Sequence, residues 1–345
     1  MEHLQHHIDL DEGFFKAFSE VGRQTFASLD SLRMYNCSRE DLVREYLDEV
    51  YIGFNSTLDE YFFEVQEVEI GREPRKVIAI DTSSIKIAES ARGVVISVKG
   101  AIVIRDLDKS TIVKTVGPFI FYITRKNSKK VFGEYSELLK STNRYDFYLY
   151  AQKILTELLE KRLQEYTVEK YKDSIILFDG SLTTTTFNCF LDSIEKILKK
   201  TLENKNEILA FSKTSFLQIS GEPLQIIHSE KNPPYIIDLT KALEYSNLGR
   251  IRVYGRVYLA RLVEGSLGYR VDAYLQNEAS TVFGLLLKND PLIYGYPETL
   301  ILAHDYSTFT KLDTITLQTM LKKMNVELLY PESVRDILFN PLDGG

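Results

Sequence analysis

The chain has 345 residues, of which 44% are hydrophobic and 26% are charged, and it has only nine prolines. This balance is typical of a globular protein and excludes collagen, a low-complexity chain and a largely disordered one. The longest apolar runs, such as Ile175–Phe178 and Val282–Leu287, are far shorter than the ~20 residues of a membrane helix, so no membrane span is expected. The N-terminus shows no secretory signal, and Cys37 and Cys189 have no metal-ligand spacing, which together favour a cytoplasmic protein.

The charge is unevenly distributed along the chain, although the net value is −7. Residues 1–75 hold 17 Asp and Glu against 7 Lys and Arg, a net charge of −10, whereas residues 86–130 hold ten basic and three acidic residues, a net charge of +7. A basic segment on an acidic chain indicates a polyanion-binding surface that is separate from an acidic partner surface. The alternative is that these charges only solvate the faces of strands.

Residues 1–75 are predicted to form a helical arm. From about Leu10 to Phe54 apolar residues recur at spacings of three and four, which is typical of amphipathic helices. Ser38–Asp41 resembles a capping box that opens a second helix. Because the arm has more aromatic side chains than a short helical segment can bury by itself, we expect it to provide dimer or partner contacts.

Residues 76–345 are predicted to form one α/β domain. A buried strand at Val77–Ile80 ends at Asp81, and the runs Gly93–Arg105 and Thr111–Thr124 are expected to be its antiparallel partners. Later helices and strands are expected, in chain order, at Arg144–Tyr166, Ser174–Phe178, Phe187–Leu202, Glu207–Phe211, Ile251–Leu262, Tyr269–Leu275, around Thr299–Phe309 and at Leu317–Met324. A three-strand meander followed by alternating helices and strands predicts an RNase H-like mixed sheet flanked by helices.

Two aspartates follow apolar strands in similar settings. Asp81 lies in Ile-Asp-Thr-Ser-Ser, and Asp179 lies in Phe-Asp-Gly-Ser-Leu. If the two strands are neighbours, the carboxylates lie close together and repel each other unless a cation neutralises them, and hard divalent ions prefer such oxygen ligands. The alternative is that each aspartate only caps the turn after its strand.

A third acid and a histidine are candidates for the same site. The helix between the two acidic strands offers Glu157, Glu160 and Glu165, and we prefer Glu157 because it is surrounded by leucines, whereas the other two have basic neighbours and are expected to be solvated. Glu157 itself could equally be a surface residue. His304 follows an apolar run eight residues after Tyr296. A single histidine on a helix is often only a satisfied polar residue, so its role depends on whether it meets the acids in space.

Four motifs, taken in order, resemble those of the NurA nuclease family of archaea and some bacteria. They are Ile-Asp81-Thr-Ser, Phe-Asp179-Gly-Ser-Leu, Phe-Ser212-Lys213-Thr-Ser and Gly-Tyr296-Pro-x-x-Leu-x-x-Ala-His304, and the resemblance extends from Lys76 to about Phe309. It implies an RNase H-like fold, a homodimer, and manganese-dependent 5′ to 3′ exonuclease activity on single- and double-stranded DNA. It also implies endonuclease activity on single strands and a partnership with the HerA hexameric translocase in processing DNA breaks.

The resemblance also implies roles for individual residues. Asp81, Glu157, Asp179 and His304 would ligate one or two Mn²⁺ ions, with Mg²⁺ as the alternative, and manganese accepts mixed oxygen and imidazole ligands. Lys213 and Tyr296 would hold the phosphate and position the attacking water or the leaving group. The residues expected to bind the DNA backbone are basic and come from the positively charged segment: Lys86, Arg92, Arg125, Lys126, Lys129 and Lys130.

Two other classes of function compete with a nuclease. An ATPase of the actin and sugar-kinase type shares the RNase H-like core, but the turn after Asp81 has no glycine and no later Gly-Gly loop for adenosine is present. A non-catalytic scaffold could retain the fold and bind a partner through the acidic arm, although the intact acids, lysine and histidine argue against it. Adding Mn²⁺ to the purified protein with linear and circular DNA would separate the three.

Overall fold

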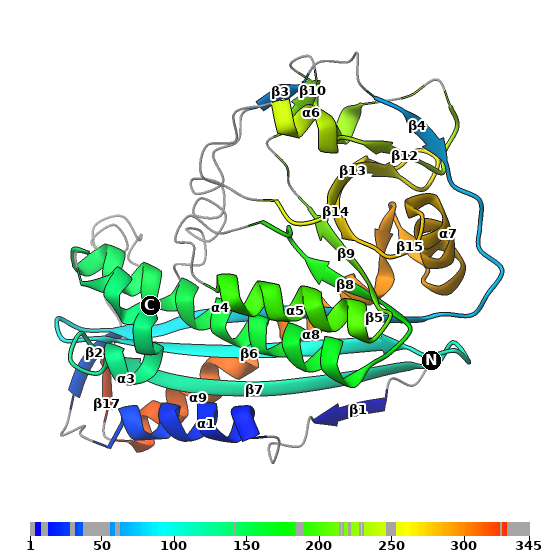
Figure 1. Cartoon of the computed structure of the whole chain (residues 1–345). Helices are drawn as coiled ribbons and strands as arrows, with labels where there is room; N and C mark the ends of the chain where they lie inside the picture. The colour runs from blue at the N-terminus through cyan, green and yellow to red at the C-terminus, as the bar shows by residue number, and fades with distance from the viewer. Residues whose placement is uncertain are drawn as a thin grey trace, which may run out of the picture.

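One large mixed sheet runs through the molecule in a computed structural model, and helices cover both of its faces (Figure 1). Its strands are β1 (Leu4–His7), β2 (Leu32–Asn36), β4 (Val65–Glu67), β5 (Lys76–Glu89), β6 (Val94–Arg105), β7 (Thr111–Ile123), β8 (Ser174–Asp179), β9 (Glu207–Ser212), β12 (Tyr235–Asp238), β13 (Arg256–Arg261), β14 (Tyr269–Tyr274) and β17 (Val326–Leu329). The structure describes residues 4–7, 13–27, 32–36, 56–58, 63–140, 142–183, 190–213, 215, 217–219, 222–227, 229, 231–245, 253–324 and 326–329.

Eight helices accompany the sheet in the described part of the chain: α1 (Gly13–Thr25), α3 (Ser128–Phe132), α4 (Arg144–Lys170), α5 (Leu191–Glu203), α6 (Thr240–Tyr245), α7 (Ala279–Asn289), α8 (Glu298–Ser307) and α9 (Lys311–Lys323). The smaller strands are β3 (Ser56–Leu58), β10 (Leu217–Ile219) and β11 (Glu222–Pro223), which form a separate sheet, and the hairpin β15 (Leu292–Ile293) with β16 (Tyr296–Pro297). Among the described residues, no helix has the length and apolar character needed to cross a membrane.

The strand order confirms the predicted fold class. Along the main sheet the order is β1-β7-β6-β5-β8-β9-β14-β13-β12-β4. β5, β6 and β7 form the predicted antiparallel meander, whereas β8 is parallel to both β5 and β9. The central order β7-β6-β5-β8-β9 places the first strand of the meander in the middle, beside the parallel strands. This is the RNase H-like arrangement of a mixed sheet flanked by helices.

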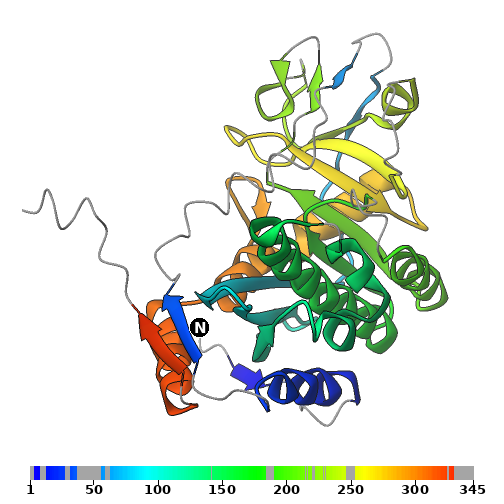
Figure 2. The same ribbon diagram turned by 90° about the vertical axis from the view of Figure 1, so that its left-hand side faces the viewer.

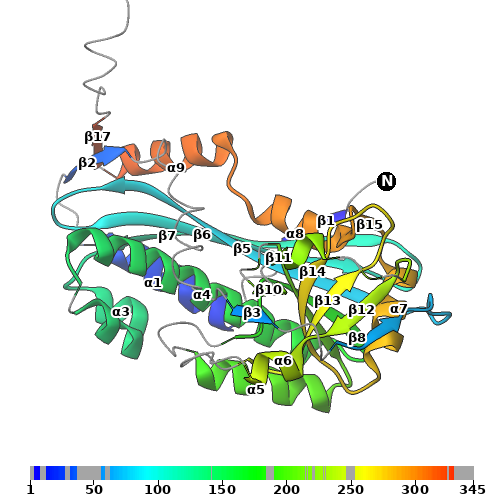
Figure 3. The same ribbon diagram turned by 90° about the horizontal axis from the view of Figure 1, so that it is seen from above.

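The two faces of the sheet carry different helices (Figure 3). On β5, Ile78 and Ile80 pack with α1, α4 and α5, whereas Val77 and Ala79 pack with α7 and α8. This division follows from the two-residue period of a strand, which sends successive side chains to opposite faces. Both faces are apolar, so the sheet is buried on both sides.

The N-terminal segment differs from the predicted helical arm. Among its described residues only α1 is helical, and Leu32, which the periodicity assigned to a helix, lies in β2. Met34 is fully buried and Tyr35 is exposed, an alternation that suits a strand. β2 pairs with β17, so segments from the two ends of the sequence lie side by side (Figure 2). The predicted second helix, which opens at Ser38–Asp41, lies outside the described residues, as do both cysteines.

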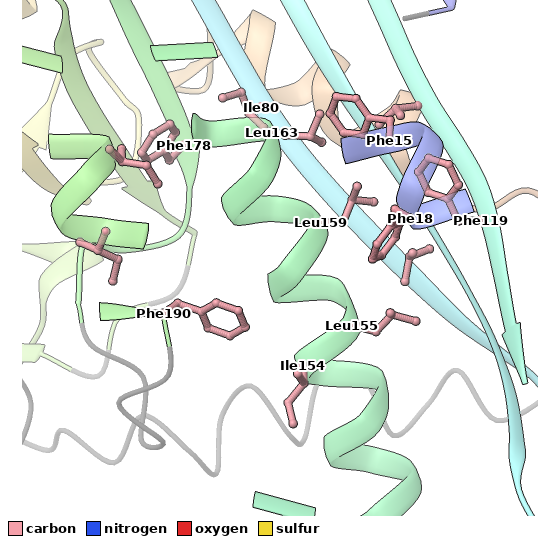
Figure 4. Close-up of a cluster of buried hydrophobic side chains, with 14 of the residues drawn as sticks. Phe15, Phe18, Ile80, Phe119, Ile154, Leu155, Leu159, Leu163, Phe178 and Phe190 are labelled. Carbon is pink, nitrogen blue, oxygen red and sulfur yellow. The ribbon is translucent and has the colours of Figure 1, made fainter. Parts of the chain in front are cut away.

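The aromatic side chains of α1 are buried within the chain itself. Phe15 and Phe18 point toward α4 and β7 (Figure 4), and the Phe18 ring lies 5.2 Å from that of Phe119 and 4.9 Å from that of Phe121. Phe15 and Phe18 therefore give no argument for a partner surface, because α4 and β7 bury them. The domain boundary before Lys76 stays a prediction, although β5 begins at that residue.

β5 is longer than the sequence indicated. Asp81 was expected at the end of a strand, but β5 continues to Glu89 and pairs with β6 along its length. Two of the hydroxyl side chains after Asp81, which suggested a turn, are hydrogen-bonded to flanking helices instead. Ser83 donates to the backbone carbonyl of Ser307 on α8, and Ser84 accepts from Gln152 on α4. Helix α7 and strand β12 were also not anticipated.

Candidate active site

Asp81 and Asp179 lie beside each other because of the register between β5 and β8. Ile80 is opposite Phe178 in this parallel pair, so the next residue on each strand is an aspartate. β8 ends at Asp179 whereas β5 continues, and the sheet therefore opens beside Asp81. Both aspartates occupy odd-numbered positions, which on these strands face α7 and α8.

His304 on α8 completes a cluster with the two aspartates. α8 packs across β5 and β6, and the Nδ1 atom of His304 lies 2.9 Å from Oδ2 of Asp81. One ligand atom from each of Asp81, Asp179 and His304 lies within 4.8 Å of the others. The hydrogen bond to the Asp81 carboxylate raises the pKa of His304. The histidine that follows Tyr296 by eight residues thus meets both acids in space.

Both oxygens of Asp81 are held in place. The backbone N–H of Thr82 donates to Oδ1 at 2.8 Å, and the Ser307 hydroxyl donates to Oδ2 at 2.8 Å. Ser307 is fully buried and also accepts, through its backbone carbonyl, a hydrogen bond from Ser83. Ser307 was not predicted from the sequence, although its position three residues after His304 on a helix places both side chains on one face.

Asp179 contacts a lysine and a tyrosine. Nζ of Lys213 lies 2.7 Å from Oδ2, and the Tyr296 hydroxyl donates to Oδ1 at 3.2 Å. Burial raises the pKa of Asp179, and the negative charge of Asp81 raises it further, while Lys213 and Tyr296 act in the opposite direction. Burial and the charge of Asp179 raise the pKa of Tyr296, so its phenol keeps its proton and acts as a hydrogen-bond donor.

The turn after Asp179 needs the glycine that follows it. Gly180 has φ of +113°, and its N–H donates to the carbonyl of Phe211 at 2.8 Å. A Cβ atom at this position would meet nothing within 4 Å, so backbone conformation rather than space demands glycine. The hydroxyl of Ser212 donates to the Gly180 carbonyl at 2.9 Å, which ties the turn to the end of β9.

A buried ion pair anchors the same turn from β14. Oδ2 of Asp272 accepts from the backbone N–H of Leu182 at 3.0 Å. The guanidinium of Arg270 donates to both oxygens of Asp272, at 2.7 and 2.9 Å, and Asp272 is fully buried. The sequence analysis missed this pair. The only available signal was the alternation of charged and apolar residues in the β14 sequence, which gives no indication of a buried partner.

Glu160 on α4 is electrostatically coupled to the aspartates. Burial raises the pKa of Glu160 to about 7, against the opposing charge of Lys161. The negative charges of Glu157, Asp81 and Asp179 raise the pKa in the same direction as burial. Glu160 is therefore only partly ionised at neutral pH when no cation is bound, because burial and nearby negative charges both disfavour its ionised form.

The other predicted glutamates are placed differently. Glu165 was expected to be solvated, but only 5% of it is exposed, and it forms ion pairs with Arg162 at 2.6 Å and Lys196 at 3.3 Å. Glu157 was preferred as a ligand and stays a prediction, since among the described residues the cluster of possible metal ligands contains none of the three glutamates. The sequence of α4 alone could not distinguish Glu157 from Glu160 as a ligand, because the two residues lie three positions apart on one face of the helix.

Five of the six predicted DNA-binding residues, all except Lys86, lie far along the strands from the acids. Asp81 is opposite Ala101 on β6, whereas Val94, seven residues earlier on β6, is opposite Ile123 at the end of β7. At about 3.4 Å per residue, this is a separation of roughly 24 Å. The basic residues at this end of the sheet include Arg92, Arg125, Lys126, Lys129 and Lys130, and they are exposed. These five residues therefore lie at a distance from Asp81 along the sheet, and their role in binding DNA stays a prediction.

Two of the predicted DNA-binding residues, Lys86 and Arg125, interact with neighbouring residues of the chain. Lys86 pairs with Glu89 at 3.0 Å. Arg125 donates to the backbone carbonyls of Leu139 and Thr142, and its guanidinium lies 4.8 Å from the centre of the Phe147 ring. Arg125 thus connects the end of β7 to the segment before α4, a structural role that the sequence did not indicate.

Comparison with known proteins connects this site to a family. A family model described as the NurA domain matches residues 75–309. The NurA nuclease from Sulfolobus solfataricus is 20% identical, with 83% of this chain and 94% of that chain covered at a TM-score of 0.45. A NurA structure bound to dAMP and manganese is 10% identical, with 83% and 93% covered at a TM-score of 0.42. Endonuclease V from Bacillus subtilis is 12% identical, with 86% and 96% covered at a TM-score of 0.37. No curated protein matches the chain.

The family match spans well over half of the chain and includes every residue of the cluster. It begins one residue before β5 and ends two residues after α8, so Asp81, Asp179, Lys213, Tyr296 and His304 all lie inside it. The chain therefore belongs to the NurA family of nucleases, which confirms both the family and the enzyme class, a metal-dependent deoxyribonuclease, that its motifs predicted.

Proposed function

We propose that Asp81, Asp179 and His304 hold a divalent metal ion with which the chain hydrolyses phosphodiester bonds of DNA. The observation that carries this proposal is the approach of their ligand atoms to within 4.8 Å of one another. Two carboxylates and an imidazole suit Mn²⁺, and solved NurA structures contain manganese, in one case with dAMP. When bound, the ion stabilises charge on the phosphate and lowers the pKa of a coordinated water.

The surrounding side chains support this chemistry in distinct ways. Lys213 is 43% exposed in its side chain while contacting Asp179, so its ammonium group can bind a phosphate oxygen that arrives from solvent. The protonated Tyr296 hydroxyl fixes the orientation of the Asp179 carboxylate. Ser307 and the Thr82 N–H fix Asp81 in the same way. The ligands are therefore oriented before substrate binds.

Metal removal is the direct test of this function. The purified chain, incubated with Mn²⁺, is expected to degrade linear DNA and to nick circular single strands, and a chelator is expected to stop both reactions because the ligand cluster loses its cation. Mg²⁺ in place of Mn²⁺ identifies the preferred ion. Gel analysis of the products, together with an assay for ATP hydrolysis, checks the result. ATP hydrolysis without DNA cleavage would support the kinase-like alternative, and neither activity would support the scaffold.

We further propose that a glutamate of α4 completes the site, with Glu157, the residue preferred from the sequence, and Glu160 as the two candidates. Glu160 is a candidate because burial raises its pKa to about 7, and the charges of Glu157, Asp81 and Asp179 raise that pKa in the same direction. A bound cation would favour the ionised form of Glu160 and draw it toward the two aspartates. Glu165 is already committed to Arg162 and Lys196 on the helix surface.

Three matched variants test the choice of glutamate. Glu160→Gln is expected to lower the Mn²⁺-dependent cleavage rate by about 100-fold or more, since it removes a charge that faces the metal, whereas Glu165→Gln should keep the rate within about threefold. Because the pKa of Glu160 is raised from 4.5 to about 7, the metal-free fold loses stability as the pH rises from about 4.5 through 7. Glu160→Gln should therefore melt above the wild type at pH 8 and together with it at pH 4. If Glu157→Gln alone abolishes cleavage, Glu157 is the ligand.

The finer activities implied by the family remain proposals for this chain. They are 5′ to 3′ exonuclease digestion of single and double strands, endonuclease cleavage of single strands, a homodimer, and action with a HerA-type hexameric translocase in DNA end resection. Digestion of 5′- and 3′-labelled duplexes tests the polarity. Light scattering tests the dimer, and stimulation of duplex digestion by a HerA-type ATPase tests the partnership.

The basic residues at the far end of the strands fit a long DNA path. At about 3.4 Å per stacked nucleotide, ~24 Å corresponds to roughly seven nucleotides between the acids and the group formed by Lys126, Lys129 and Lys130. Contacts to phosphates carry no sequence information, so binding through them should be indifferent to sequence and weaken with salt. A variant with these three lysines changed to glutamate tests the path. An unchanged affinity and salt dependence would place the DNA elsewhere.

A further inference from the structure

An exposed tyrosine projects from a tight hairpin next to the active site. β15 and β16 pair with Ile293 opposite Tyr296, which leaves Tyr294 and Gly295 as a two-residue turn. Both have positive φ, +51° and +84°, the combination found in type I′ hairpin turns. Glycine suits that conformation, but a bulky aromatic residue rarely adopts it. Tyr294 is nevertheless placed there with 82% of its surface exposed.

Tyr269 on β14 holds the β15–β16 hairpin in place. The hydroxyl of Tyr269 on β14 donates to the backbone carbonyl of Tyr294 at 3.1 Å. The Tyr269 ring also packs at 5.3 Å against that of Tyr296, whose own hydroxyl contacts Asp179. Tyr294 is therefore held on a short, braced turn, two residues from a side chain that touches a proposed metal ligand.

Exposed apolar side chains lie near Tyr294. Ile293 beside it is 44% exposed, and Leu267 on the β13–β14 loop, which the hairpin touches through Ser266 and Gly295, is 50% exposed. Such a surface does not suit phosphates, but it suits the flat faces of nucleobases, which stack on aromatic rings whatever their sequence. A phosphate has its own partner nearby in Lys213, whose Nζ lies 5.8 Å from the centre of the Tyr296 ring.

We propose that Tyr294 stacks on an unpaired base of the DNA strand whose phosphate is held by Lys213 and the metal site. This inference rests on the proposed function, because it assumes that DNA enters this site. It assigns to the hairpin a preference for unpaired strands and frayed ends, since a base inside a duplex already stacks on its neighbours. The hydroxyl of Tyr294 takes no part, so the ring alone is required.

Binding measured without catalysis tests the proposal. Fluorescence anisotropy with an end-labelled single-stranded oligonucleotide, in the presence of a chelator, reports affinity while no cleavage occurs. Tyr294→Phe should bind as the wild type does, whereas Tyr294→Ala should bind about 5- to 100-fold more weakly. Tyr294→Asn should show the same loss although asparagine tolerates positive φ, so a weakened turn cannot explain it. The matched control is Leu312→Ala, an apolar residue on α9 that is 72% exposed, and it should not change binding.

A scan of abasic sites identifies the base. One abasic nucleotide is moved along the oligonucleotide. It should weaken binding by the wild type at one position near the cleaved end, and an abasic nucleotide at that position should not weaken binding by Tyr294→Ala any further. Affinity for a covalently closed circular duplex, which has no ends and no unpaired bases, should differ less than twofold between the two proteins. If wild type and Tyr294→Ala bind single strands equally well, or if Tyr294→Ala loses as much affinity for the closed duplex as for the single strand, the stacking role alone is overturned. Absence of both DNA binding and Mn²⁺-dependent cleavage in the wild type would overturn the proposed function itself.

Discussion

Asp81→Asn and Asp179→Asn are each expected to lower the rate of Mn²⁺-dependent DNA cleavage by at least about 1,000-fold. Each change removes one of the two carboxylates in the three-residue cluster, and loss of a ligand weakens both metal binding and charge stabilisation in the transition state. Asparagine keeps the shape of the side chain and an oxygen that can accept from Ser307 or Tyr296. The fold should therefore persist.

Thermal melting separates loss of the site from loss of the fold. Because burial and the charge of Asp81 raise the pKa of Asp179, removing the charge of Asp179 relieves repulsion, and the metal-free Asp179→Asn variant should melt at or above the wild-type temperature. Mn²⁺ should raise the melting temperature of the wild type but not that of either variant. Asp173→Asn is the control, since Asp173 is an exposed residue paired with Arg75. Wild-type cleavage by either variant would refute the site.

The sequence predicted the centre of the fold well because its strands carry strong local signals. β6 and β7 are dense in β-branched and aromatic residues, and the turn between them is polar, so local preference and final structure agree. The pairing of Asp81 with Asp179 was also predictable, since an acid after an apolar strand on each of two parallel neighbours must share one region of the sheet. The length of β5 was not, because its hydroxyl residues resemble a turn until β6 and the flanking helices supply hydrogen bonds.

The positions of helices relative to the sheet could not be obtained from the sequence. His304 reaches Asp81 because α8 crosses β5, and nothing within α8 itself specifies that crossing. Likewise Glu157 and Glu160 share a helix face, and only the packing of α4 on the sheet distinguishes their surroundings. The aromatic residues of α1 suggested a partner, yet β7 and α4 bury Phe15 and Phe18. Amphipathic periodicity thus shows that a face is buried, but not what covers it.

The second large effect is expected at Asp272, where Asp272→Ala should reduce the free energy of unfolding by about 3–5 kcal/mol. Asp272 is fully buried, and its removal leaves the guanidinium of Arg270, only 7% exposed, without the carboxylate that neutralises it. The backbone N–H of Leu182 also loses its acceptor. A loss of this size is a large share of the ~5–15 kcal/mol that stabilises a typical domain.

Urea denaturation of the full chain measures this effect against an exposed ion pair of similar length. Glu327→Ala breaks the contact between Glu327 and Arg33, 2.6 Å long and largely exposed on both sides, and should cost less than about 1 kcal/mol because water screens the charges. Replacing both members of the buried pair, in Arg270→Met with Asp272→Leu, should recover much of the loss, because no charge then remains buried alone. The residual deficit of this double variant would reflect the Leu182 N–H, which holds the turn that begins at Gly180. A loss below about 1 kcal/mol for Asp272→Ala would mean that Arg270 finds another partner, and that the turn beside Asp179 does not depend on this pair.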